Sequence, residues 1–113
     1  MQRCRIRGMD HLEAFLAELR PLLERTDAAA AYLFGSHARG DADAHSDIDV
    51  IVVAPSERSP VDRFRDYLPA IVSAGVGVDL FVYTPEEFAA LHEEERPFLM
   101  AALEGARIIY EGS

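Results

Sequence analysis

Two aspartates stand close together at the start of an apolar run. Asp47 and Asp49 are separated by one residue, and the chain then continues as a β-branched stretch to Ala54. Side chains two apart on a strand project from the same face, so these two carboxylates should converge. Two like charges this close repel unless a cation lies between them or one takes up a proton. The pair is a candidate cation site, although an isolated pair of this kind is more often a solvated turn.

A third aspartate, Asp79, strengthens the interpretation of Asp47 and Asp49 as a cation site. It interrupts the run Val76–Tyr83, which otherwise has the apolar composition of a buried strand. An unpaired carboxylate inside such a strand is costly. If this strand lies beside the one that carries Asp47 and Asp49, the three carboxylates form an oxygen cluster of the kind that Mg²⁺ prefers. The alternative is that Asp79 caps a backbone group or pairs with an arginine.

A glycine-rich turn precedes the aspartates. Gly35 ends an apolar run and is followed by Ser36, then by Arg39 and Gly40. Glycine at a strand end lets a phosphate approach the backbone, and successive amides of a tight turn or a helix N-terminus attract anions. Ser36 adds a hydroxyl donor, and Arg39 could meet a phosphate oxygen. A Gly-Ser turn alone is weak evidence, but its combination with three carboxylates indicates a site for metal-bound phosphate.

Several other side chains are expected to have structural roles and no part in the chemistry. His37 and His45 flank the turn, but their pattern is not that of a zinc site, and we expect both to be exposed loop residues. Near the C-terminus, Phe98, Leu99, Met100 and Leu103 are expected to belong to the core. A role of this last group as a groove for a partner stays open.

The periodicity of apolar residues predicts the elements that position these groups. A capping box at Thr84–Glu87 should open one helix, and Pro21 should kink another. The expected helices cover residues 9–26, the segment from the Ser59–Pro60 start to Gly75, the segment from Thr84 to Leu91, and residues 98–103. The expected strands cover residues 29–34, 47–54, 76–83 and 107–110.

This order of elements predicts an α/β (α+β) fold, in which a small mixed β-sheet of about four strands is covered by helices, as a single domain over residues 1–113. The strands that start at Asp47 and Val76 are joined by a helix, so they should be parallel. The link between Phe34 and Ser46 is too short for a crossover, which favours antiparallel pairing of the first two strands. That pairing would place Gly35 beside Asp47.

Composition and charge narrow the classes of function. Half of the 113 residues are hydrophobic, as in a globular domain, and no segment has the length and hydropathy of a membrane span. The formal net charge of -9 disfavours direct nucleic-acid binding. The single cysteine, Cys4, and the absence of an apolar leader-like stretch make a reducing cytoplasm the expected compartment.

Taken together, these residues resemble a known family. The segment GSHARGDADAHSDIDVIV, residues 35–52, is similar to the signature of the DNA polymerase beta-like nucleotidyltransferase superfamily. Its fuller form resembles the minimal nucleotidyltransferases (MNT) that act as antitoxins in HEPN/MNT pairs, with Val50 where leucine is more usual. The resemblance implies the nucleotidyltransferase fold. It further implies Asp47 and Asp49 as ligands of two Mg²⁺ ions, Asp79 as the third carboxylate, and Gly35 and Ser36 as contacts of the phosphates of ATP.

The resemblance also suggests an acceptor. The motif occupies the whole chain, so we expect either that the acceptor is another protein whose surface completes the site or that a second subunit supplies the missing wall. The resemblance implies a HEPN-type toxin in a stable hetero-oligomer, silenced by transfer of AMP to a hydroxyl group, expected to be that of a tyrosine. Two alternatives remain: a small-molecule nucleotidyltransferase similar to the aminoglycoside-modifying enzymes, and an antitoxin that neutralises by binding alone.

Overall fold

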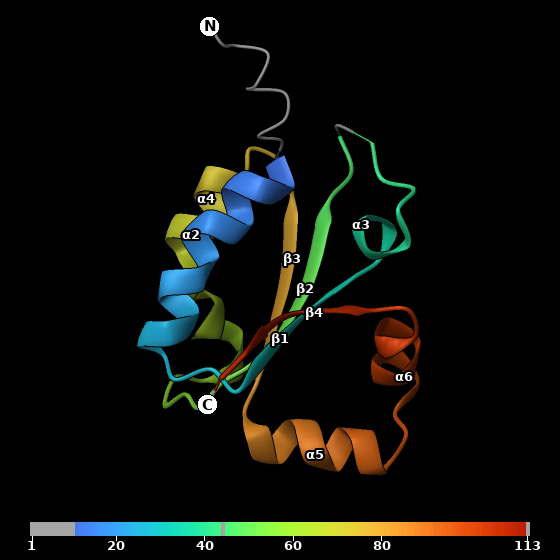
Figure 1. Cartoon of the computed structure of the whole chain (residues 1–113). Coiled ribbons are helices and arrows are strands. Elements are labelled where there is room, and N and C mark those ends of the chain that lie inside the picture. The colour runs from blue at the N-terminus through green and yellow to red at the C-terminus, as the bar shows by residue number, and fades with distance from the viewer. Residues whose placement is uncertain (1–10, 44, 113) are drawn as a thin grey trace, which may run out of the picture.

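The computed structural model describes residues 11–43 and 45–112. Helices and strands alternate along most of this part of the chain, as expected (Figure 1). The elements in chain order are α2 (His11–Arg25), β1 (Ala30–Phe34), α3 (Ser36–Arg39), β2 (Ile48–Val53), the 3-10 helix η1 (Pro60–Tyr67), α4 (Leu68–Ala74), β3 (Val78–Tyr83), α5 (Pro85–Glu93), α6 (Pro97–Leu103) and β4 (Arg107–Glu111). Met9 and Asp10, at the expected start of the first helix, lie outside the described residues.

The strands form one mixed sheet in the order β3-β2-β1-β4. β1 is antiparallel to β2, whereas β2 and β3 are parallel, and both pairings were expected from the lengths of the connections. β4 returns antiparallel to β1 and forms the far edge of the sheet. The predicted mixed α/β fold is therefore confirmed.

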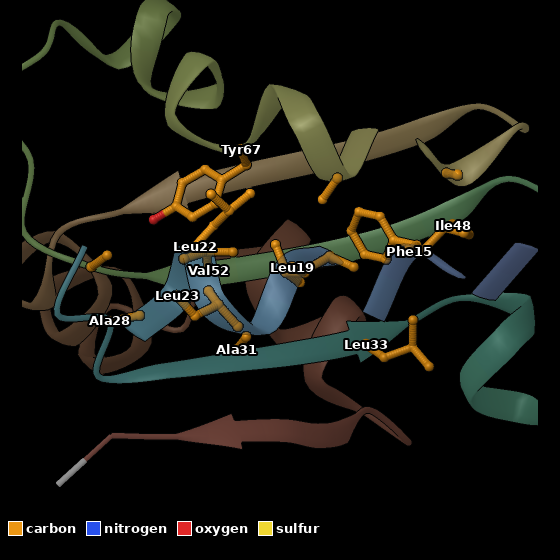
Figure 2. Close-up of a cluster of buried hydrophobic side chains, with 14 residues drawn as sticks. Phe15, Leu19, Leu22, Leu23, Ala28, Ala31, Leu33, Ile48, Val52 and Tyr67 are labelled. Carbon is orange, nitrogen blue, oxygen red and sulfur yellow. The ribbon is translucent and has the colours of Figure 1, made fainter. Parts of the chain in front are cut away.

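The two faces of the sheet carry different side chains. One face packs against α2 and α4, with Leu33, Ile48 and Val52 fully buried beneath Phe15 and Leu19 of α2 (Figure 2). The opposite face is covered by α5 and α6 over part of its area (Figure 1). Because strand side chains alternate between faces, the residues between those of the first core belong to this second, partly open face.

α2 supplies much of the larger core. Its buried residues Phe15, Leu19, Leu22 and Leu23 follow helical spacing and form one apolar stripe against the sheet. The helix continues through Pro21 to Arg25, so the proline does not end it. Within the described part of the chain, no helix is both long and apolar enough to cross a membrane.

The segment expected as one helix before Gly75 is divided in two. Residues Pro60–Tyr67 form a 3-10 helix, and α4 begins at Leu68 with Pro69 in its first turn. A proline ring would collide with the carbonyl four residues earlier in a continuous α-helix, and proline also disfavours helical geometry at the preceding residue. The amide of Leu68 accordingly donates to the carbonyl of Arg65, three residues back. The sequence-based expectation of a single regular helix was wrong at this point.

The buried side chain of Arg63 links η1 to β3 and to the start of α5. Arg63, only 7% exposed, donates from Nη1 and Nη2 to the two carboxylate oxygens of Glu87, at 2.6 and 3.1 Å, and from Nη1 to the carbonyl of Val82. Glu87 also accepts from the amide of Thr84, and Thr84 Oγ1 accepts from the amide of Glu87, which confirms the predicted capping box. This network joins η1, β3 and the start of α5.

α6 presents a mixed surface. Leu99 is buried as expected, but Phe98 is 47% exposed, so its assignment to the core was wrong. The two residues are neighbours on a short helix and therefore project in different directions. The exposed ring of Phe98 lies on the partly open face of the sheet, against Phe34 of β1 and Phe81 of β3.

Candidate active site

Two of the three aspartates are direct partners in the sheet. Asp49, the second residue of β2, is paired with Asp79, the second residue of β3, in the parallel register. Paired residues of neighbouring strands project from the same face, here the partly open one. Asp47 precedes β2 by one residue, and its carboxylate acts electrostatically on that of Asp49. The structure thus brings the three predicted carboxylates to one end of one face.

Gly35 lies directly against the side chain of Asp49. The space between them admits the hydrogen atom of a glycine but no larger side chain. β1 ends at Phe34, which pairs with Asp49 across the antiparallel ladder. A Cβ built on Gly35 would overlap Asp49 Oδ2, and the backbone has φ +75°, a region that glycine favours. The turn after β1 is therefore in contact with Asp49, and not with Asp47 as expected from the sequence.

A second glycine has the same relation to Asp47. A Cβ on Gly77 would lie 2.6 Å from Asp47 Oδ1, and the Gly77 carbonyl accepts from the amide of Ile48. Sequence reasoning missed this residue. The signal was an isolated glycine inside a predicted strand, which marks a site of close approach. Gly35 and Gly77 thus provide the space that the first two carboxylates occupy.

The electrostatics of the site show how closely the acids approach. Burial raises the pKa of the Asp49 carboxyl above its usual range, and the neighbouring carboxyl of Asp79 and the charge of Asp47 raise it further. His37 acts in the opposite direction and lowers the same pKa. Asp49 is therefore the least solvated acid of a group whose negative charges repel one another.

α3 places backbone amides beside the acids. Gly35 is the N-cap of this short helix, and the amides of Ala38 and Arg39 both donate to its carbonyl. The amides of Ser36 and His37 come earlier in the first turn, where a helix offers no carbonyl to bond. The predicted tight turn at Gly35–Ser36 is thus the start of a helical turn, which can present N–H groups to an anion.

Arg39 and the two histidines lie around this turn. Arg39 is exposed and its Nε is 3.4 Å from Asp41 Oδ2, so the structure does not bring it to the three aspartates. His37 is half-buried on α3, with Nε2 3.4 Å from the carbonyl of Ser46, and the expectation of an exposed loop residue was wrong. His45 is exposed, as expected.

The donor chemistry at this end of the sheet fits a hard cation. The three side chains supply carboxylate oxygens, and Gly35 leaves room at the most buried of them. Among the residues that the structure describes, no three or more acidic, histidine or cysteine side chains stand as a ready-made metal cage. Mg²⁺ characteristically uses one or two protein carboxylates and completes its shell with phosphate oxygens and water, so the arrangement fits a metal that arrives with a nucleotide.

The chain is similar to known proteins over almost its whole length. A profile of the nucleotidyltransferase domain matches residues 12–111, which include every group described above. The chain belongs to this family. The matched region runs from the first turn of α2 to the end of β4, and the predicted membership of the nucleotidyltransferases is confirmed.

Individual relatives agree with this assignment. The nucleotidyltransferase is 31% identical over 90 residues to a Methanocaldococcus jannaschii protein provisionally named a protein adenylyltransferase. That match covers 75% of this chain and spans 60% of the length of the relative. A solved structure provisionally identified as a minimal nucleotidyltransferase is 29% identical, with a TM-score of 0.59 and coverage of 88% of this chain and 95% of the other.

A more distant neighbour shares the fold. It is a toxin–antitoxin crystal structure determined with AMP-PNP, at 19% identity and a TM-score of 0.61. The match covers 87% of this chain and 74% of that one. At this level of identity the likeness shows a common fold, and the fold is the mixed sheet with helices on both faces described above.

Proposed function

We propose that this nucleotidyltransferase transfers AMP from ATP to a hydroxyl group of a partner protein, with Mg²⁺ bound by Asp47, Asp49 and Asp79. The observation that carries the proposal is the pairing of Asp49 with Asp79 beside Gly35. It puts carboxylates and the amides of a helical turn at one end of one sheet face. Similarity to a relative provisionally named a protein adenylyltransferase supports the choice of reaction.

The site divides into two parts with different tasks. The turn at Gly35 and Ser36 would bind the phosphates through backbone amides and the Ser36 hydroxyl. Asp47 and Asp49 would hold two Mg²⁺ ions, with Asp79 as a further ligand. Ions held by these residues would supply positive charge to offset the negative charge on the phosphate oxygens and the leaving pyrophosphate. Arg39, at the end of the same short helix, is the candidate for a further phosphate contact once released from Asp41.

The chain's own residues then direct the transfer. An acceptor hydroxyl oxygen attacks the α-phosphorus of ATP, a new oxygen–phosphorus bond forms, and the bond to pyrophosphate breaks. Asp79 is an exposed acid on β3, the edge strand of the sheet, and would orient the hydroxyl and accept its proton. Much of the rate enhancement comes from holding these groups in line.

We propose a HEPN-type toxin as the partner, modified on a tyrosine and neutralised in a stable complex in the cytoplasm. The similar fold of an antitoxin-containing complex determined with AMP-PNP supports this context. The net charge of -9 favours a partner with basic character, as an RNA-cleaving protein would have.

Two alternatives predict different products. A small-molecule nucleotidyltransferase would transfer AMP to a hydroxylated compound in the absence of any partner. A non-enzymatic antitoxin would neutralise its toxin through binding, with no adduct on either protein. The carboxylate pairing favours an enzyme over the second alternative, because repelling acids at a strand end have no evident use in simple binding.

Incubation with ATP labelled at the α-phosphate, Mg²⁺ and the product of the adjacent gene distinguishes these possibilities. The proposal predicts label on the partner protein and none when the label is on the γ-phosphate. The matched control is the double variant Asp47→Asn, Asp49→Asn, which keeps the size and shape of both side chains. It should fold normally and transfer nothing.

The same assay can contradict the proposal. Rapid label transfer to a small hydroxylated compound without the partner would support the small-molecule enzyme. Neutralisation of the partner by the double variant, with no label on either protein, would support the binding antitoxin.

A further inference from the structure

A pocket of about 280 Å³ lies between α3 and α6, immediately beside Gly35. Figure 1 shows these two helices on the same side of the sheet. The walls combine aromatic rings, small residues and one residue of each charge. Its lining consists of Phe34, Gly35, Ala38, Arg39, Phe98, Ala101, Ala102, Glu104 and Gly105. The roles proposed above for the carboxylates do not use this space.

Aromatic rings form one side of the pocket. Phe98 stands edge-on to Phe34, with ring centroids 6.0 Å apart and planes at 85°, and Phe81 supports it from β3 at 5.2 Å. Although apolar, Phe98 leaves 47% of its surface exposed. A large apolar side chain held by two other rings, yet open to solvent, offers a flat surface on which another ring can stack.

We propose that this pocket binds the base of the nucleoside triphosphate, by stacking against Phe98 and by a hydrogen bond to Glu104. The inference rests on the proposed function, which puts the phosphates at Gly35 and Ser36. Gly35 belongs to both the phosphate turn and the pocket, so a nucleoside joined to the α-phosphate extends directly into it. Stacking of bases on aromatic side chains is favourable and tolerates any base, because every base has a π-face.

Glu104 gives the pocket a preference among bases. A carboxylate only accepts hydrogen bonds, so it matches a base with an exocyclic amine, such as adenine, and offers uracil a poorer partner. The small side chains of Ala101 and Ala102 and the bare backbone of Gly105 leave the space between Phe98 and Glu104 open. The expected ligand is therefore an amine-bearing base, with adenine as the base of ATP.

The position of the pocket separates it from the acceptor. The sheet order is β3-β2-β1-β4, and the pocket adjoins the end of β1. Asp79, which would receive the acceptor, lies on the edge strand β3, two strands from β1, and does not line the pocket. The base and the acceptor thus reach the carboxylates from different sides and do not compete for the same space.

Calorimetric binding of ATP and of inorganic tripolyphosphate, each with Mg²⁺, tests the inference without any partner. Phe98→Ala should weaken ATP binding by about tenfold or more and leave tripolyphosphate binding unchanged. Phe98→Tyr retains the ring and should bind ATP as the wild type does. The matched control is Phe64→Ala, which removes another exposed phenylalanine, 38% exposed, on η1 away from the pocket.

A second variant blocks the pocket without removing a ring. Ala101 is exposed, so Ala101→Leu should fold normally and fill the space that the base needs. It should weaken ATP binding and leave tripolyphosphate binding intact. ATP should also bind more tightly than UTP, and Glu104→Ala should abolish that difference.

The outcomes distinguish this inference from the proposed function. If ATP binds the wild type, Phe98→Ala and Ala101→Leu with equal affinity, the base lies elsewhere and the inference fails while the proposed function stands. If Phe98→Ala keeps ATP affinity but loses AMP transfer to the partner, the pocket serves the acceptor and the inference is overturned. If the wild type binds neither ligand, the proposed function fails and the inference with it.

Discussion

Asp49 and Asp79 face each other across the parallel pair β2–β3, and Gly35 closes on Asp49 from the neighbouring strand. This relationship sets two acids against each other where a sheet would ordinarily bring apolar side chains together. Burial and the neighbouring acids raise the pKa of Asp49, so the arrangement costs folding free energy in the absence of a cation.

Asp49→Asn should stabilise the metal-free protein at neutral pH. A raised pKa in the folded state means that ionised Asp49 destabilises the fold at pH 7, and this penalty disappears as the pH falls below the unfolded-state value. We expect the melting temperature in chelator to rise by a few degrees at pH 7, with a smaller rise near pH 4. A fall in melting temperature at pH 7 would show that the Asp49 carboxylate is stabilised by contacts other than those described.

Gly77→Ala should weaken binding of Mg²⁺-ATP while leaving the fold intact. The added Cβ would lie 2.6 Å from Asp47 Oδ1, and the side chain must move to relieve that contact. We expect a loss of affinity on the order of tenfold, equivalent to about 1.4 kcal/mol. In an Asp47→Asn background the same change should have little additional effect on affinity, because the affected carboxylate is already absent. Fully additive losses would place the effect of Gly77 elsewhere.

Arg63→Met should destabilise the protein by about 1–3 kcal/mol, because it removes charge-assisted hydrogen bonds from a buried position. The matched control is Arg65→Met, two residues along η1. Arg65 forms an exposed ion pair with Asp62, and its replacement should change stability by no more than about 0.5 kcal/mol. Denaturant unfolding measures both, and equal losses for the two variants would contradict the role given to the buried arginine.

Glu87 should make part of this stability dependent on pH. The guanidinium of Arg63, with the amide of Thr84, lowers the pKa of Glu87 below its ordinary value of 4.5. A lowered folded-state pKa contributes stability that is fully present above the ordinary value and is lost as the pH falls through the folded value. Glu87→Gln should therefore flatten the acid side of the stability curve, and Arg63→Met should have much the same effect on that slope. A slope unchanged in both variants would exclude the pair as its source.

The sequence predicted the parts of the fold that depend on local patterns and connection lengths. Strand periodicity put Asp47 and Asp49 on one face, and the helical link between strands predicted the parallel pairing that aligns Asp49 with Asp79. The capping box at Thr84 was likewise a local signal. These features follow from short-range stereochemistry.

The features that were missed depend on contacts between distant segments. The pairing of β4 with β1 has no local signature, and the approach of Gly77 to Asp47 is visible only once β2 and β3 are placed. Phe98 was assigned to the core because of its type, whereas its exposure follows from how α6 meets the sheet. The 3-10 geometry before Pro69 was readable in principle, since proline restricts the residues that precede it.

The intact mass of the partner protein after co-expression tests the central claim most directly. The partner should gain the mass of one or more AMP groups with the wild-type nucleotidyltransferase, and fragmentation should place them on a hydroxyl side chain. With the Asp47→Asn, Asp49→Asn variant, purified in the same complex, the partner should keep its unmodified mass. An unmodified partner in the wild-type complex, or an AMP adduct that persists with the double variant, would contradict the claim that these carboxylates catalyse transfer of AMP to a protein.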